Sequence, residues 1–119
     1  MSTMTDTRSE SGVKSAAPRE ARSWVERGEA VIVDVREPFE RASEWIEGSE
    51  HQPLGKLDPR SLPAADEMRV VFQCRSGKRS LKAAERYLGS RGGEAYNLEG
   101  GLLAWKDAGL PVARGDGGP

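Results

Sequence analysis

The sequence concentrates its reactive side chains in one short stretch that begins at its single cysteine. This stretch combines a thiol, three cations, two hydroxyls and a glycine: Cys74, Arg75, Ser76, Gly77, Lys78, Arg79 and Ser80. A thiol becomes a nucleophile when it ionises, and nearby cations or a helix N-terminus favour the thiolate. We therefore expect the pKa of Cys74 to lie below the value of about 8.5 of a free cysteine. The same positive field would attract an anionic substrate.

The flanking segments predict how this stretch is positioned. Residues 69–73 form an apolar, β-branched run typical of a buried strand, and helical spacing follows at Leu81, Ala84 and Leu88. Cys74 should therefore lie at the carboxyl end of a strand, where ligand sites gather in open α/β sheets. The glycine of the loop would let backbone N–H groups turn inward and form an anion-binding nest. The alternative to a nucleophile is a cysteine that only packs in the core beside a solvated basic turn. Such a cysteine would not need a polar, glycine-bearing loop after it.

The three cations cannot all point at one sulfur atom from so tight a loop. If backbone N–H groups cradle the sulfur, the side chains must radiate toward the rim. We expect Lys78 and Arg79, just before the helix, to border the entrance of the site. We expect Arg75 to hold neighbouring carboxylates.

Two more polar residues, Asp34 and Arg36, come at the end of another buried strand, which residues 30–35 predict. Arg36 could add positive charge near the sulfur. We favour a structural ion pair of Arg36, with Glu40 as a candidate partner, that fixes the turn after the strand. His51 has no second ligand residue near it in the sequence and is expected to be a surface or capping histidine.

Helix-like and strand-like segments alternate along the chain, which favours an α/β domain with a mostly parallel sheet. Strands are expected at residues 30–35, 69–73 and 95–98, with weaker ones at 13–14 and 51–52, and helices at 18–27, 38–42, 81–89 and 101–108. We expect the domain at residues 13–113, a disordered segment at 1–12 and a flexible tail at 114–119.

Composition narrows the function classes. The chain of 119 residues is long enough for one domain, and its net charge of −1 argues against a nucleic-acid binder. The longest apolar run, residues 30–33, is far too short to span a bilayer, and no signal peptide is apparent at the N-terminus. We expect a cytoplasmic protein, where a lone thiol stays reduced. With one cysteine and one histidine, no metal site and no other cofactor is expected.

Three motifs resemble those of the rhodanese family. Residues 31–40 (VIVDVREPFE) resemble its first signature, and the stretch from Cys74 resembles its active-site loop. Residues 97–101 (NLEGG), with Trp105 and the GLPV of residues 109–112, resemble its C-terminal pattern.

The resemblance implies a single-domain α/β fold with three layers, α/β/α, around a five-stranded, mostly parallel sheet. It also implies that Cys74 carries sulfane sulfur as a persulfide, that the loop after it binds substrate, and that Gly100 and Gly101 face the active site. One departure is that Glu44 and Trp45 stand where the family commonly has glycine and histidine. We expect local repacking there, without loss of activity.

A sulfurtransferase is the leading hypothesis, with small sulfur-containing anions such as thiosulfate as donors and cyanide, a thiol or a sulfur-carrier protein as acceptor. A non-catalytic rhodanese-like module that binds a partner or regulates is the alternative. A cysteine-loop phosphatase or arsenate reductase is disfavoured, because its C-x5-R motif needs an arginine where Ser80 stands. A disulfide oxidoreductase would need a resolving cysteine, which the chain lacks.

Overall fold

The computed structural model describes residues 12–115. The segments expected to be disordered or flexible at residues 1–11 and 116–119 lie outside the described residues. The elements in chain order are β1 (Val13–Ala16), α2 (Pro18–Glu26), β2 (Ala30–Asp34), α3 (Pro38–Ser43), β3 (Glu44–Trp45), β4 (Glu50–His51), two 3₁₀ turns (Leu54–Lys56 and Pro59–Ser61), β5 (Arg69–Gln73), α4 (Lys78–Arg91), β6 (Ala95–Leu98), α5 (Gly101–Asp107) and β7 (Ala113–Arg114).

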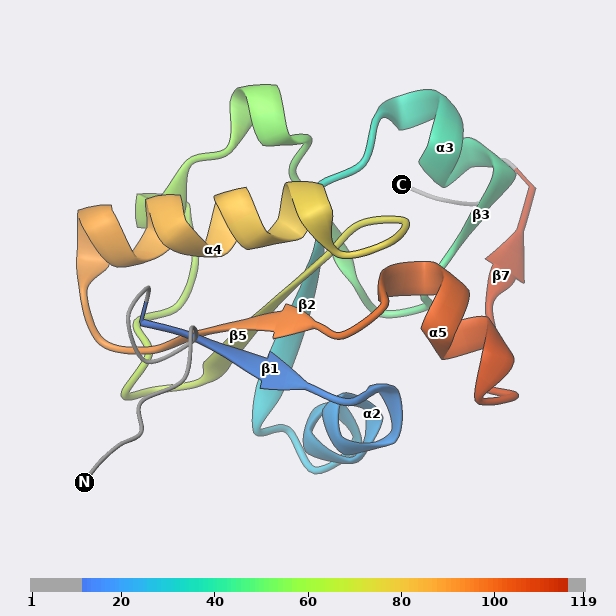
Figure 1. The fold of residues 1–119 in the computed structure, drawn as a ribbon, viewed down its shortest axis with the longest axis horizontal. Coiled ribbons are helices and arrows are strands. Elements are labelled where there is room, and N and C mark those ends of the chain that lie inside the picture. Colours follow the sequence, from blue (N-terminus) through green and yellow to red (C-terminus); the bar gives the residue numbers. More distant parts are fainter. Residues whose placement is uncertain (1–11, 116–119) are drawn as a thin grey trace.

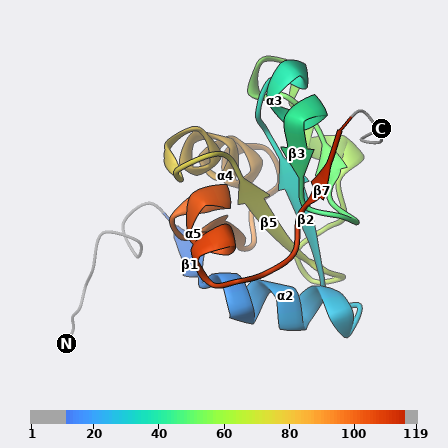
Figure 2. The ribbon, with the colours of Figure 1, turned by 90° about the vertical axis from the view of Figure 1, so that its right-hand side faces the viewer.

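A five-stranded parallel sheet forms the middle layer, in the order β1-β6-β5-β2-β4. Figure 1 shows α4 on one side of this sheet and α2 on the other, which confirms the three-layer architecture. Because the strands are parallel, their carboxyl ends meet at one edge. Figure 2 looks onto this edge, with α3, α5 and the small antiparallel pair β3-β7 in front. The first residue expected in the tail, Arg114, lies in β7.

The central strands β2 and β5 are apolar on both faces, as the sequence predicted. Val33 and Phe72 belong to the core under α4, whereas Ile32 and Val71 belong to the core under α2 and α5. Alternate residues of a strand point to opposite faces, so a continuous apolar run serves both cores at once. Cys74 lies in the core under α4 and is 1% exposed.

The buried face of α4 agrees with the prediction at Ala84 and Leu88 and differs from it at Leu81. Leu81 is 37% exposed, and the residues that face the core are Ser80, Ala83, Ala84 and Tyr87. These four follow the i, i+3, i+4, i+7 spacing of one helix face. A hydroxyl therefore begins the buried face, and the apolar residue after it points to solvent.

A fully buried carboxylate organises the turn that follows β2. Asp34 accepts two hydrogen bonds from the guanidinium of Arg36, at 2.9 and 2.8 Å, and one from Arg41 at 3.3 Å. Arg36 also donates to the carbonyl of Glu44 at 2.8 Å, and Arg41 donates to the hydroxyl and carbonyl of Ser49 at 3.0 and 2.8 Å. One buried anion thus connects β2 to α3, to the start of β3 and to the turn before β4.

This network confirms a structural role for Arg36 but corrects its expected partner. Arg36 pairs with Asp34, and its contact with Glu40 is only a long hydrogen bond of 3.5 Å to the backbone carbonyl. His51 caps the carbonyl of Arg36 through Nε2 at 2.8 Å. Trp45, which stands where the family commonly has histidine, lies under the guanidinium of Arg41 at 4.9 Å from its ring centre. A cation–π contact therefore occupies this position.

Removing the buried anion should destabilise the fold strongly. We expect Asp34→Ala to lower the free energy of unfolding by about 3–5 kcal/mol, because two buried guanidinium groups lose their counter-charge. The control is Glu29→Ala, which removes exposed ion pairs with Arg27 and Arg69 and should leave the free energy of unfolding almost unchanged. Urea unfolding at neutral pH measures both values, and equal losses would contradict the central role of Asp34.

Candidate functional site

The sulfur of Cys74 lies directly after β5, near the middle of the carboxyl edge of the sheet. The chain turns through Arg75 and Ser76 and enters α4 at Gly77, whose φ of 110° is in the left-handed region that glycine accepts without strain. This tight turn folds the loop backbone around the sulfur. The N–H of Gly77 donates to Sγ at 3.0 Å, and the hydroxyl of Ser80 lies 3.3 Å from Sγ.

These hydrogen bonds decide the acidity of the thiol. Burial has the largest single effect and raises the pKa of Cys74, since it disfavours a charged sulfur. The hydroxyl of Ser80 and the backbone N–H groups of Ser80, Gly77 and Ser76 act in the opposite direction and together prevail, so the pKa lies below the ordinary thiol value. The expected direction is therefore found, and hydrogen bonds from the loop, rather than its cationic side chains, are the main cause.

Hydrogen bonds of the Asn97 side chain, a role that the sequence did not indicate, hold the loop in this shape. The amide of Asn97, on β6, donates to the carbonyl of Gly77 at 3.0 Å and accepts from the hydroxyl of Ser80 at 2.6 Å. Asn97 therefore fixes both residues that hydrogen-bond to the sulfur of Cys74. A polar residue inside a short apolar strand is the signal that could have indicated this role.

The N-terminus of α5 holds the loop from another side. The N–H groups of Leu102 and Leu103 donate to the carbonyls of Cys74 and Arg75, at 2.9 and 3.1 Å. Gly101 makes this approach possible, because a Cβ there would lie 2.5 Å from the carbonyl carbon and oxygen of Arg75. The diglycine Gly100-Gly101 was expected to face the active site. In the structure, Gly101 lies against the backbone of the Cys74 loop. The carbonyls of that backbone accept hydrogen bonds from the first turn of α5.

The structure reverses the expected roles of two loop cations. Arg79, in the first turn of α4, makes a two-pronged ion pair with Glu40 of α3 at 2.7 and 2.9 Å. The hydrogen bonds from Arg79 are the main reason why the pKa of Glu40 is lowered to about 2. Arg75 is exposed, and no ion pair of its side chain is found among residues 12–115. Lys78 is also exposed. Arg79 thus holds a carboxylate, while Arg75 is available at the rim.

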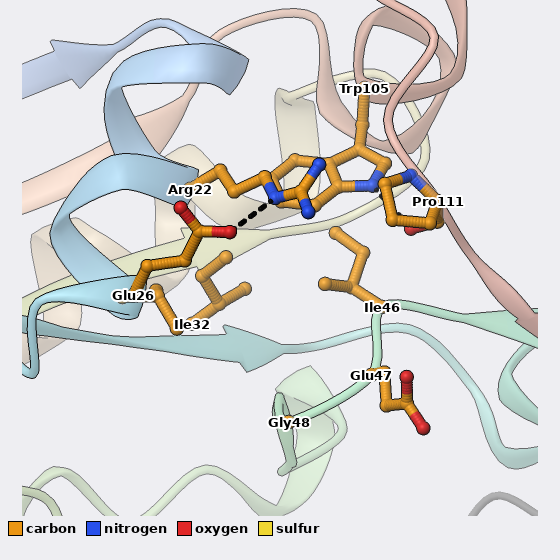
Figure 3. Close-up of a pocket in the computed structure, with 9 residues that line it drawn as sticks. Arg22, Glu26, Ile32, Ile46, Glu47, Gly48, Trp105 and Pro111 are labelled. Atoms are coloured by element: carbon orange, nitrogen blue, oxygen red, sulfur yellow. Dashed lines mark hydrogen bonds and ion pairs between the residues drawn. The ribbon is translucent and has the colours of Figure 1, made fainter.

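A separate hollow of about 190 Å³ lies on the face covered by α2 and α5 (Figure 3). Ile32, Ile46 and Trp105 form its apolar wall, and the exposed ion pair of Arg22 and Glu26 lies beside it. Cys74 does not line this hollow, and its sulfur lies in the core on the other face of the sheet. This hollow is therefore separate from the loop around Cys74.

Within residues 12–115, no group of three His, Cys, Asp or Glu side chains is arranged to hold a metal ion. Over the same residues, no helix has the length and apolar character needed to cross a membrane.

Comparison with known proteins places the loop in a family context. The model of the family described as "Rhodanese-like domain" matches residues 17–108. The uncharacterized protein slr1261 of Synechocystis is 40% identical over 104 residues, which is 87% of this chain and 58% of the relative. The thiosulfate sulfurtransferase GlpE of Pseudomonas fluorescens is 36% identical over 89% of this chain and 95% of the relative.

A solved structure supports the same fold. The rhodanese-related protein of Thermoplasma volcanium superimposes with a TM-score of 0.73 at 26% identity, over 84% of this chain and 97% of its own. The chain therefore spans nearly the full length of this structure and of GlpE, and somewhat more than half of slr1261.

The hydroxyl of Ser80 should be needed for the lowered pKa of the Cys74 thiol. We expect Ser80→Ala to raise the pKa of Cys74, because the variant loses a hydrogen bond that favours the thiolate. A titration of thiolate ultraviolet absorbance against pH measures the midpoint. Ser76→Ala is the matched control, since Ser76 acts on the sulfur through its backbone N–H, which the substitution keeps. The midpoint of the Cys74 titration should therefore be the same in Ser76→Ala as in the native protein. A midpoint that is unchanged or lower in Ser80→Ala would refute this assignment.

The close approach at Gly101 should make it intolerant of a methyl group. We expect Gly101→Ala to reduce the free energy of unfolding by about 1–3 kcal/mol more than Gly109→Ala, because its Cβ overlaps the loop backbone. Gly109 is a fair comparison, since it also has a positive φ, of 78°, but has open space around its Cβ position. Chemical unfolding of both variants gives the difference, and similar losses would show that backbone strain alone matters.

Proposed function

Because this chain belongs to the rhodanese-like domain family, we propose that it is a sulfurtransferase in which Cys74 carries sulfane sulfur as a persulfide. The observation that carries the proposal is the loop geometry, in which the N–H of Gly77 and the hydroxyl of Ser80 hydrogen-bond to Sγ. Groups placed in this way stabilise a sulfur anion at the moment it forms. They support the nucleophilic thiolate, and the same donors can serve an anionic persulfide.

With thiosulfate as donor, the Cys74 thiolate attacks the outer sulfur of the dianion. A bond forms between Sγ and this sulfur, the sulfur–sulfur bond of thiosulfate breaks, and sulfite leaves with the electron pair. The enzyme then holds an anionic persulfide, so charge balances across the step. The choice of thiosulfate is supported by the similarity to GlpE and by the small, hydrogen-bonding cradle around Sγ.

In the second step, an acceptor removes the outer sulfur and regenerates the thiolate. Cyanide would attack that sulfur, the bond to Sγ would break, and thiocyanate would leave. A cellular thiol or a sulfur-carrier protein would replace cyanide in the cell. This double displacement through a covalent intermediate needs no metal and no organic cofactor. The cytoplasm, which keeps thiols reduced, suits a protein whose single cysteine must stay reactive.

The contacts of Ser80 count against phosphate chemistry. A cysteine-loop phosphatase would need an arginine at this position to clamp a tetrahedral oxyanion. Ser80 is fully buried and its hydroxyl donates to Asn97, so it offers no such clamp. The neighbouring Arg79 is engaged by Glu40. A cradle of this kind suits one sulfur atom better than a phosphate, and the lowered pKa of Cys74 favours catalysis over a purely regulatory module.

Cys74 should be the only site of sulfur loading. After incubation with thiosulfate, we expect a mass increase of about 32 Da on Cys74, corresponding to one sulfur atom and reversed by cyanide. Intact-mass spectrometry measures the adduct, and thiocyanate formation measures turnover. Cys74→Ser should fold normally and lose both signals. Thiocyanate formation by Cys74→Ser, or a disulfide-linked dimer as the only product of the native protein, would reject the proposed mechanism.

A further inference from the structure

A pocket beside the Cys74 loop is larger than thiosulfate requires. It has a volume of about 310 Å³ and is formed by residues of α3, β3, the loop and α5, among them Phe39, Arg75 and Leu103. Figure 1 shows the loop between β5 and α4 reaching toward the space between α3 and α5. Ligand pockets begin at roughly 300 Å³, whereas thiosulfate is a single sulfur with four small substituents.

The pocket adjoins the reactive loop through direct contacts on two sides. On one side, Leu102 and Leu103 are held against the backbone of Cys74 and Arg75 by hydrogen bonds of 2.9 and 3.1 Å. On the other side, Glu40 is held by Arg79, which lies in the first turn after the loop. A molecule in this pocket would therefore lie beside the loop that cradles the sulfur.

Part of the pocket wall is apolar and exposed. Phe39 is 75% exposed and Leu103 is 40% exposed, and these are two of the three large apolar side chains exposed among residues 12–115. A small, strongly hydrated dianion gains little from apolar contact, because the hydrophobic effect acts on apolar area removed from water. The apolar wall therefore fits a substrate that has carbon atoms of its own.

The charged part of the wall carries one uncompensated positive group. Glu40 is paired with Arg79, and Glu44 is paired with Lys106 at 2.7 Å. Arg36, another charged residue of the wall, is paired with the buried Asp34. The exposed side chain of Arg75 remains without an ion pair within residues 12–115. The pocket is therefore complementary to a ligand with an anionic group.

We propose that this pocket binds the sulfur acceptor, and that the acceptor is a peptide-sized thiol bearing a carboxylate. Carbon atoms of the acceptor would contact Phe39 and Leu103, and its carboxylate would lie near Arg75. The inference rests on the proposed sulfurtransferase function. In the transfer step, the acceptor thiolate attacks the outer sulfur of the anionic persulfide and forms a new sulfur–sulfur bond. The bond to Sγ breaks, Cys74 leaves as a thiolate, and the acceptor carries the outer sulfur away as its own anionic persulfide.

The test is single-turnover discharge of the full chain after its persulfide has been loaded with thiosulfate or polysulfide. Glutathione is the probe with carboxylates, glutathione diethyl ester is the same thiol with them masked, and cyanide is an acceptor too small to fill the pocket. Intact mass reports loss of the adduct, and rates are compared per thiolate. The variant is the double substitution Phe39→Ala with Leu103→Ala. Its control is Leu81→Ala, which removes a leucine of similar exposure, 37%, away from the pocket.

We expect the double variant to lose about tenfold in the second-order rate constant with glutathione, because two apolar contacts disappear. Its discharge by cyanide should change less than about twofold, and Leu81→Ala should leave both rates unchanged. The native protein should prefer glutathione to its ester, and added salt should reduce this preference, since it screens Arg75. Parallel losses with cyanide and glutathione, or no loss with glutathione, would overturn the acceptor pocket while leaving the persulfide mechanism intact. Failure to load any persulfide would instead reject the sulfurtransferase function.

Discussion

The structure depends on hydrogen-bond donors that face a buried sulfur atom. Burial alone opposes the thiolate of Cys74, and only N–H and O–H donors directed at the sulfur reverse this effect. Directed donors require a loop backbone that cannot relax. The carbonyls of Cys74 and Arg75 are accordingly bound by the first turn of α5, and the carbonyl of Gly77 by Asn97. The chemistry of the site therefore follows from how the backbone is held, more than from which charged side chains surround it.

The supports of the loop come from elements far apart in the sequence. The diglycine before α5 allows two backbones to meet, and Asn97 reaches the loop from the neighbouring strand β6. From the other side, α3 contributes Glu40, which anchors Arg79. The position of α3 depends in turn on Asp34, whose carboxylate holds Arg36 and Arg41. The carboxylate of Asp34, at the end of β2, thus stabilises the position of α3, and α3 in turn holds the first turn of α4 through Glu40.

Much of this arrangement could be predicted from the sequence, because it depends on local pattern. The apolar runs of β2 and β5 indicated strands buried on both faces, and the cysteine followed by a glycine-bearing loop indicated an anion cradle. The errors concern side chains whose partners are distant. The exchange of roles between Arg75 and Arg79 depends on where α3 places Glu40, and spacing within the loop does not contain that information. The exposure of Leu81 has a similar origin, since the buried face of α4 begins at Ser80.

The hydroxyl of Ser80 has one proton and two neighbours that can receive it, the sulfur of Cys74 and the amide oxygen of Asn97. When the sulfur is protonated, it can donate to Ser80, and Ser80 donates to Asn97. When the sulfur is anionic, the hydroxyl must rotate to donate to it, and the partly buried amide oxygen of Asn97 loses its donor. Ionisation of the sulfur is therefore coupled to a rotation of a single O–H bond. In the proposed sulfur transfer, this rotation would recur at each turnover, and its energy would depend on Asn97 of β6, outside the loop itself.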